Sequence, residues 1–275
     1  MHPLPFSSMT TTLNFFYYFC THNNIEYIIM SGHSKWSTIK RKKGALDAKR
    51  SKIFSRIIKE ITVAVKEGGP DPDGNPRLRM AIANAKGNSM PKDNIERAIS
   101  KGKDKDGLNF AELTYEGYAP HGIAVFLECT TDNTQRTIAN VRKVFTKYGG
   151  TLGTNGSLSF LFERKGIFVV PKGNIDPDEF EMEVIDAGAD DIELTDDKFI
   201  ITTSIENYGS MNSKLEAMDI SPETVELQRI PNETKMLDLE SSLKIMKMID
   251  AFEEDDDIQN VFHNLEMTDE LAAAL

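Results

Sequence analysis

The clearest pattern along the chain is a two-sided helix predicted for residues 47–67. Apolar residues at helical spacing predict its buried side: Ile53, Phe54, Ile57, Ile58, Ile61, Ala64 and Val65. Cations at steps of three, four and three residues lie roughly opposite them: Lys49, Lys52, Arg56 and Lys59. We therefore expect a helix that packs on one side and presents a row of positive charge on the other.

Two shorter helices follow, and with the first they predict a small helical bundle. After the loop at residues 68–74, Asn75 and Pro76 indicate an N-cap and a first-turn proline. This helix runs to Gly87, and a third runs from near Pro91 to Gly102. The Asp-x-Asp-x-Asn spacing at 71–75 imitates a calcium loop, but Pro76 and Ile82 stand where glycine and a bidentate glutamate are required. A capped turn is the better interpretation.

The rest of the chain predicts strands mixed with helices. Strands are expected at 112–118, 123–131 and 157–162, with a helix at 134–148. Residues 166–230 follow the order βαββαβ, which is the ferredoxin-like order. A helix at 239–252 and a strand at 258–265 then complete the domain that began near residue 108. The predicted fold class is α+β: an N-terminal three-helix domain followed by two ferredoxin-like α+β domains, the third inserted into the second.

These elements define four segments. They are a leader at 1–30, a basic helical domain at 31–106, an α+β domain at 107–164 plus 235–275, and an inserted domain at 165–234. The leader has no Lys or Arg, which argues against a secretory or mitochondrial targeting segment. Its apolar run at 13–20 is too short to cross a membrane. We expect either a poorly ordered extension or translated upstream sequence, with Met30 as the true start.

Charge is distributed very unevenly along the 275 residues. The net charge is −11, yet residues 31–106 carry +10 and residues 107–275 carry −20. A basic part that meets a polyanion and an acidic part that limits non-specific contact would explain this division. Only two cysteines are present, which fits a reducing, cytoplasmic location.

Residues that could carry catalysis or bind a metal are not arranged for either. The histidines and cysteines lack metal-ligand spacing, and no nucleophile–base or paired-carboxylate arrangement stands out. The glycines at 149, 150, 153 and 156 follow a helix, so they indicate a helix end and not a phosphate loop. The five acids at 253–257 predict a solvated loop. We expect a non-enzymatic protein without a cofactor, metal, small-molecule substrate or membrane partner.

The basic run is the strongest candidate for a binding site. Residues 35–60 contain ten cations and two acids, and arrayed Lys and Arg dominate affinity for nucleic acids. Trp36 lies within the run, where it either stacks on a base or serves as a packing anchor. The predicted nucleic-acid-binding residues are Lys35, Trp36, Lys40, Arg41, Lys42, Lys43, Lys49, Arg50, Lys52, Arg56 and Lys59.

Several stretches of the sequence resemble the YebC/PmpR family. They are SGHSKW at 31–36, IKRKK at 39–43, DAKRSKIF at 47–54, GGPDP at 68–72, NPRLR at 75–79, MPKDNI at 90–95 and YEGYAP at 115–120. The resemblance runs from residue 31 to the C-terminus, and the 29 residues before Met30 depart from it. It implies three domains, the third inserted into the second, and a cytoplasmic regulator without a catalytic site or cofactor.

The resemblance and the charge pattern leave two functions open. The first is a DNA-binding transcriptional regulator, as members of the family are described. The second is a ribosome- or RNA-associated translation factor, because relatives that include the mitochondrial translational activator of cytochrome oxidase act on translation. A row of lysines does not distinguish the two polymers, since phosphate contacts carry no base code. The lack of an obvious helix-turn-helix signature and the acidic remainder favour RNA, and the oligomeric state stays open.

Overall fold

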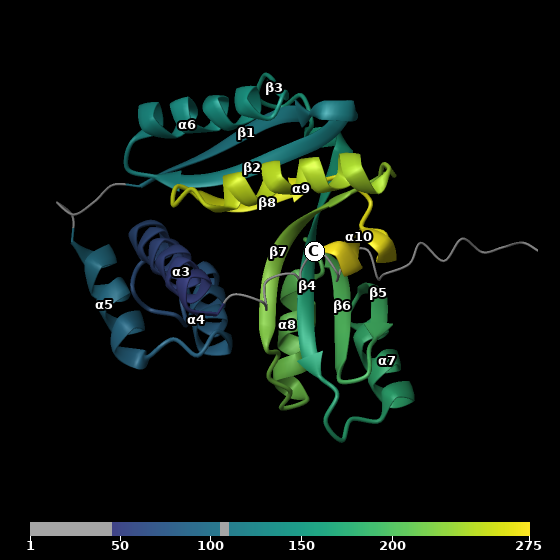
Figure 1. Cartoon of the computed structure of the whole chain (residues 1–275). Helices are drawn as coiled ribbons and strands as arrows, with labels where there is room; N and C mark the ends of the chain where they lie inside the picture. The colour runs from purple at the N-terminus through teal and green to yellow at the C-terminus, as the bar shows by residue number, and fades with distance from the viewer. Residues whose placement is uncertain (1–45, 105–109) are drawn as a thin grey trace, which may run out of the picture. The chain divides into compact units, whose positions relative to one another are not determined.

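The computed structural model describes residues 46–104 and 110–275, with side chains from residue 51 onward. The predicted leader and the basic run at 35–43 lie outside the described residues. The described chain consists of N-terminal helices followed by two antiparallel sheets (Figure 1), and this confirms the predicted α+β class.

Three helices form the helical domain: α3 (Leu46–Gly68), α4 (Pro76–Gly87) and α5 (Lys92–Lys103). The apolar side of α3 packs against α4 and α5, as the periodicity predicts. Its most buried members are Ile61 and Ala64, which meet Leu78 and Ala81 of α4 and Ala98 of α5 in one core. This core fixes which side of α3 faces away from the bundle.

Asn75 closes the loop between α3 and α4. Its side-chain oxygen accepts a hydrogen bond from Leu78 N at 3.1 Å, which caps α4. Its amide nitrogen donates to Ala64 O at 2.7 Å and to Gly69 O at 2.8 Å, which satisfies the end of α3. The structure thus confirms the capped turn, and the side chain is buried where a calcium ligand would have to face an ion.

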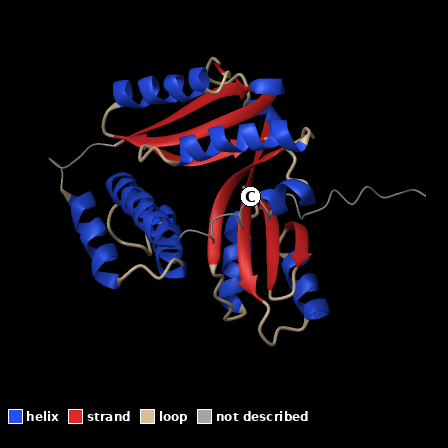
Figure 2. Cartoon of the chain, viewed as in Figure 1, coloured by secondary structure: helices blue, strands red, loops and turns tan. Residues whose placement is uncertain are grey.

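The first sheet has the order β3-β1-β2-β8, with every pair antiparallel. Its strands are β1 (Ala111–Ala119), β2 (Ile123–Thr131), β3 (Thr151–Leu152) and β8 (Ile258–His263). Helices α6 (Thr134–Lys147) and α9 (Leu239–Glu253) cover one face of it (Figure 2), and the core between them includes Leu127, Phe145 and Phe252. Because β8 and α9 come from the end of the chain, this domain is built from two separate segments.

The second sheet is formed by the residues in between. Its order is β5-β6-β4-β7, from β4 (Phe162–Pro171), β5 (Ala189–Leu194), β6 (Lys198–Ser204) and β7 (Thr224–Pro231). Helices α7 (Pro177–Asp186) and α8 (Tyr208–Ala217) pack on it and give the ferredoxin-like order. The first sheet has the same spatial arrangement of strands when β3, β1, β2 and β8 are matched with β5, β6, β4 and β7. The order along the chain differs, because β1 comes first in its domain whereas its counterpart β6 comes third.

The structure corrects the predicted strand at 157–162. A short 3-10 helix (Ser159–Leu161) stands there, and β4 begins only at Phe162 and continues to Pro171. The cause is Glu116 of β1, whose buried carboxylate accepts hydrogen bonds from Gly156 N at 2.8 Å and Leu158 N at 2.5 Å. These backbone donors are used by a side chain and are not available to a strand. The short strand β3 and the C-terminal helix α10 (Asp269–Ala274) were not predicted.

Helix α4 also contacts the second sheet. The Asn84 side-chain oxygen accepts a hydrogen bond from Val225 N of β7 at 3.2 Å. Gly87 lies so close to the main chain that an added Cβ would come within 2.1 Å of Glu223 O. The helical domain is therefore packed on the main chain of the inserted domain, and at Gly87 the contact leaves no room for a larger side chain.

Candidate nucleic-acid interface

The predicted binding residues fall into three groups. Six of them (Lys35, Trp36, Lys40, Arg41, Lys42 and Lys43) lie outside the described residues. Lys49 and Arg50 belong to the first turns of α3, but their side chains are not among those described. The structure therefore places three of the predicted side chains, those of Lys52, Arg56 and Lys59.

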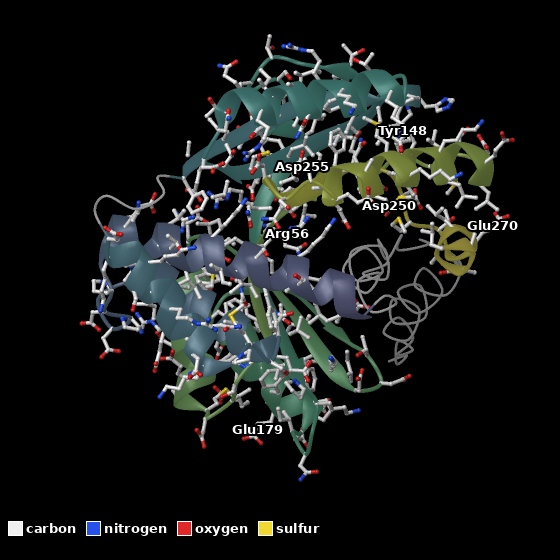
Figure 3. All side chains as sticks on the ribbon, turned by 60° about the vertical axis from the view of Figure 1, so that its left-hand side comes forward. Arg56, Tyr148, Glu179, Asp250, Asp255 and Glu270 are labelled. Carbon is white, nitrogen blue, oxygen red and sulfur yellow. The ribbon has the colours of Figure 1, made fainter. Side chains whose placement is uncertain are left out.

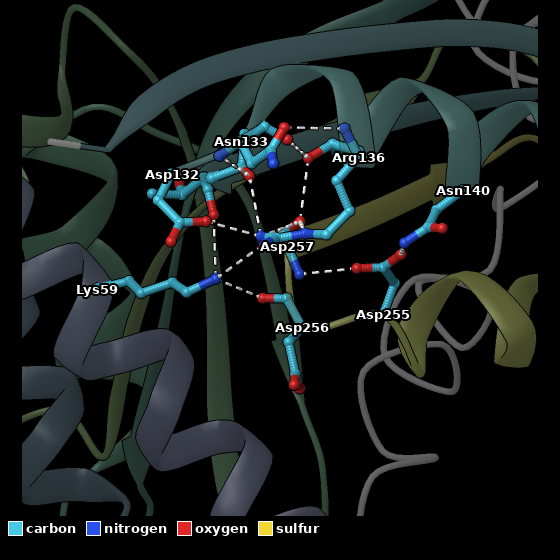
Figure 4. A network of polar contacts seen from close by, with 11 residues as sticks. Lys59, Asp132, Asn133, Arg136, Asn140, Asp255, Asp256 and Asp257 are labelled. Carbon is cyan, nitrogen blue, oxygen red and sulfur yellow. Dashed lines mark hydrogen bonds and ion pairs between the residues drawn. The ribbon is translucent and has the colours of Figure 1, made fainter. Parts of the chain in front are cut away.

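These three cations bind the end of α9 and the acidic turn after it, residues 253–257. Lys52 Nζ donates to Glu254 O at 2.9 Å and Arg56 donates to Glu253 O at 2.8 Å. Figure 3 labels Arg56 on α3 and Asp255 of the acidic turn. Lys59 Nζ donates to Asp256 O at 2.7 Å and to Thr130 O of β2 at 3.1 Å (Figure 4). Three members of the predicted row of cations on α3 thus meet another part of the chain, where the sequence predicted a free outward face.

The position of these contacts follows from helix chemistry. The last carbonyls of an α-helix have no partner inside the helix, and that end carries the negative pole of the helix dipole. Lys52 and Arg56 supply donors and positive charge there, and the helix they cap lies about 200 residues later in the sequence. Burial lowers the pKa of the Arg56 guanidinium, while the charges of Glu253 and Asp256 act in the opposite direction.

Asp257 anchors the acidic turn, and it corrects the prediction of a solvated loop. Its carboxylate is buried and receives hydrogen bonds from Arg136 of α6 at 2.8 and 3.0 Å and from Thr137 at 3.0 Å. Lys59 Nζ lies 3.4 Å from the same carboxylate. Burial alone would raise the pKa of Asp257, but the hydrogen bonds from Arg136 and Thr137 and the charge of Lys59 bring it below its ordinary value.

A hollow of about 570 Å³ lies beside this network. It is lined by Lys59, Phe110, Asp132, Arg136, Asn140, Asp255, Asp256 and Asp257. Most of its polar groups are paired with one another: Arg136 with Asp132 at 2.7 Å and Asn140 with Asp255 at 2.9 Å. Because these polar groups pair with one another, we interpret the hollow as part of the contact between α3, α6 and the acidic turn and not as a ligand site.

Glu60 of α3 is a partly buried carboxyl group in the neighbourhood of Arg77. Only part of its side chain reaches solvent, and burial raises its pKa to about 7. Arg77 opposes the shift, whereas Glu226, Glu112 and Glu128 add to it. Arg77 itself bridges α3 and β1, because it pairs with Glu67 at 2.6 Å and also with Glu112. The Glu60 carboxyl group therefore changes between its neutral and its charged form close to neutral pH.

The cations that remain exposed on the helical domain were not singled out from the sequence. They are Arg79 and Lys86 of α4 and Lys92, Arg97, Lys101 and Lys103 of α5. They are spread over two helices instead of forming a dense run, so only their exposure in the fold distinguishes them. They provide positive surface that does not depend on the cations bound to the acidic turn.

Two features of the described residues bear on reactive chemistry, a buried thiol and the placement of possible metal ligands. Burial raises the pKa of Cys129 to about 12, which keeps its thiol protonated and unreactive. Within residues 46–104 and 110–275, no group of three or more His, Cys, Asp or Glu side chains is placed to hold a metal ion. None of the helices in this part of the chain is long and apolar enough to cross a membrane.

Comparison with known proteins identifies the family. The model of the TACO1/YebC N-terminal domain matches residues 34–105, and the model of the TACO1/YebC second and third domain matches residues 110–265. The chain belongs to the TACO1/YebC family. This confirms the resemblance seen in the sequence.

Curated relatives and a solved structure agree with this assignment. A protein of Amoebophilus asiaticus named "Probable transcriptional regulatory protein" is 48% identical over 239 residues, covering 86% of this chain and 98% of its own. One from Geobacter sp. (strain M21) with the same description is 49% identical over 242 residues, covering 88% and 98%. The crystal structure of the conserved hypothetical protein Aq1575 from Aquifex aeolicus is 44% identical, with a TM-score of 0.77 over 86% of this chain and 99% of that one.

Proposed function

We propose that the protein is a regulator of gene expression that acts by binding nucleic acid, in the first place duplex DNA, through its helical domain. The single observation that carries the proposal is the set of six exposed cations on α4 and α5, which persists although three α3 cations are already bound. The curated relatives' description as transcriptional regulatory proteins supports the same role. The protein would act in the cytoplasm by binding, without catalysis and without a cofactor.

The basic segment before the described residues would supply further phosphate contacts. We assign this role to Lys35, Lys40, Arg41, Lys42, Lys43, Lys49 and Arg50, with Trp36 as a stacking or packing residue. Lys52, Arg56 and Lys59 would contribute fully only if they left the acidic turn, since each is already bound to a main-chain carbonyl there. Nucleic acid and the acidic turn would then compete for the same side chains.

A second candidate is a translation factor that binds structured RNA or the ribosome. It is favoured by the acidity of residues 107–275, which carry a net charge of −20 and would repel a long duplex lying across them. A compact RNA contact restricted to the helical domain would avoid that repulsion. Both candidates use the same phosphate-binding surface, so they differ in the polymer and not in the residues.

Binding of the full chain to duplex DNA and to structured RNA, measured over a series of salt concentrations, tests the proposal. The logarithm of affinity should fall linearly with the logarithm of salt, with a slope of about −0.9 per phosphate neutralised on duplex DNA. Replacing Lys40, Arg41, Lys42 and Lys43 by Gln should weaken binding and flatten the slope. The control replaces Arg142, Lys143, Lys147 and Lys244 by Gln, on the helices that cover the first sheet.

The outcomes separate the candidates. Salt-dependent binding to DNA that is lost in the basic-segment variant and kept in the control supports the first. Crosslinking in living cells followed by sequencing of DNA and RNA then decides between polymers, and recovery of ribosomal RNA without promoter DNA would reverse our order. Absence of binding to either polymer would refute the proposal, and equal binding by the two variants would refute the role assigned to the basic segment.

A further inference from the structure

The connection between α4 and α5 has the features of a helix-turn-helix. Four residues, 88–91, separate the two helices. Ser89 has a φ of 55°, the left-handed conformation that ends a helix abruptly, and Met90 N donates to Ala85 O at 2.9 Å. A turn of three or four residues that often contains glycine is typical of this motif. Here Ser89 stands at the left-handed position, which explains why the sequence alone does not reveal the motif.

The packing inside the turn agrees with that geometry. Met90 is buried although it belongs to the turn, and it joins one core with Ala81 and Ala85 of α4 and Ile95 and Ala98 of α5. Both helices pack on α3, and Met90 joins them in the same core at the turn. The relative position of α4 and α5 is thus set by their common packing on α3 and by the buried Met90, and a helix that recognises bases needs such a fixed position.

The outer side of α5 carries side chains that suit base recognition. Asn94, Arg97 and Lys101 recur at steps of three and four residues and therefore share one side of the helix. Arg97 and Lys101 are exposed. Arg97 Nε donates to Asp93 O at 3.2 Å and its guanidinium also contacts the Asn94 side chain, so the two are held side by side. Arg and Asn are the side chains that pair with guanine and adenine edges in the major groove.

The charge around this side also suits a duplex. Helix α5 has four cations and two acids, and one of the acids, Glu96, is paired with Lys92 at 3.5 Å. Arg79, on the first turn of α4, is exposed as well, where the first helix of such a motif crosses the phosphate backbone. Among the described elements α5 packs mainly on α3, and it lies at the outer edge of the helical domain in Figure 1.

From these observations we infer that α4 and α5 form a helix-turn-helix unit, and that α5 enters the major groove of duplex DNA with Asn94, Arg97 and Lys101 facing the bases. The inference rests on the proposed function and names the surface that recognises the DNA base sequence. It commits to DNA, because an α-helix fits the wide major groove of B-form DNA, whereas the major groove of A-form RNA is too deep and narrow. Lys52, Arg56 and Lys59 of α3 then hold the helical domain on the acidic turn and do not contact the DNA bases.

The test selects duplexes that bind the full chain from a random pool and measures their affinity for four variants. Arg97→Ala should weaken binding to the selected sequence about 10-fold or more, with a smaller effect on a scrambled one. Arg97→Lys keeps the charge but loses the paired donors, so it should reduce the preference between the two sequences and leave affinity for the scrambled one nearly unchanged. Lys101→Ala should weaken both. The double variant Arg142→Ala/Lys143→Ala on the exposed side of α6 is the control and should bind as wild type.

Each result supports the inference or overturns it. Loss of preference in the two Arg97 variants supports α5 as the reading helix, provided that their thermal unfolding matches that of the wild type. Wild-type affinity and preference in the Arg97 and Lys101 variants would overturn the inference. If the Lys40–Lys43 variant still lost binding in that case, the proposed function would stand without it. Binding to RNA alone would likewise overturn only the reading helix, and binding to neither polymer would overturn both.

Discussion

Arg56 donates a 2.8 Å hydrogen bond to the main-chain oxygen of Glu253, the last residue of α9, which lies 197 positions later in the sequence. The contact joins the helical domain to the part of the first sheet's domain that comes from the end of the chain. Because the acceptor belongs to the main chain, a substitution of Glu253 would not remove it. Arg56 is therefore the partner through which the contact can be tested.

Arg56→Met should lower the free energy of unfolding by about 1–3 kcal/mol, because it keeps most of the apolar stem but removes the donor from a helix end that is partly buried. Urea unfolding at neutral pH measures the difference. Arg142→Met, on the exposed side of α6, is the matched control and should change stability by much less. Equal stability of the two variants would mean that the Arg56 contact adds nothing measurable.

Asp257→Asn should destabilise the protein by about 1–3 kcal/mol at pH 7, because it leaves the donors of Arg136, Thr137 and Lys59 without a charged acceptor. The pKa of Asp257 is lowered in the folded protein, so its contribution is present above the unfolded value of about 3.9 and is lost as pH falls through the folded pKa. Unfolding measured from pH 7 down to pH 3 should show the gap between variant and wild type closing. The exposed neighbour variant Asp256→Asn should show neither effect.

Glu60→Gln should stabilise the protein at pH 8 and have little effect at pH 4.5. The folded pKa of Glu60 is raised to about 7 from an ordinary 4.5, so the folded state holds the proton more tightly than the unfolded one. Ionisation therefore costs stability as pH rises through this window, by at most about 3 kcal/mol, and Gln avoids the cost. Unfolding free energies at pH 4.5, 6 and 8 give the profile. An exposed control, Glu206→Gln, should run parallel to wild type, and the same behaviour in Glu60→Gln would contradict the shift.

Glu116→Ala should destabilise the protein by about 2 kcal/mol, because Gly156 N and Leu158 N lose their acceptor. Hydrogen exchange at the buried Leu158 should speed up locally. Thr114→Ala removes a hydrogen bond to Asn155 in the same loop, at 3.2 Å and exposed, so it should cost little. Unchanged exchange at Leu158 in the Glu116 variant would show that the loop is held by other contacts.

The sequence predicted those elements whose pattern is local and periodic. Helix α3 and strand β2 agree with their predicted ranges within a residue, because Ile57, Ile61 and Ala64 mark one side of a helix and residues 123–131 form an unbroken buried strand. The start of β4 was missed because the charged residues 163–165 interrupt the apolar pattern before Ile167. The 3-10 helix before it depends on Glu116, about 40 residues earlier.

The same limit explains the candidate interface. Periodicity shows which side of α3 is apolar, and it leaves the opposite side to be interpreted as free. The partners of Lys52, Arg56 and Lys59 are mainly main-chain carbonyls, which carry no residue-type signal. The acidic turn contained a visible clue, since its five acids are opposite in charge to the row on α3, yet the separation of nearly 200 residues hides the pairing. The exposed cations on α5 need the fold as well, because exposure cannot be seen in a sequence.

The split construction of the first sheet also sets an order of events during synthesis. A ribosome delivers α3 to α5 first, then β1 to β3, then the whole inserted unit, and only at the end α9 and β8. Until those last residues emerge, β2 has no neighbour on its β8 side, and the carbonyls of residues 253–256 that Lys52, Arg56 and Lys59 bind have not been made. A nascent chain stalled before residue 239 therefore carries Lys52 and Arg56 without their helix-end partners, beside a sheet that is still one strand short.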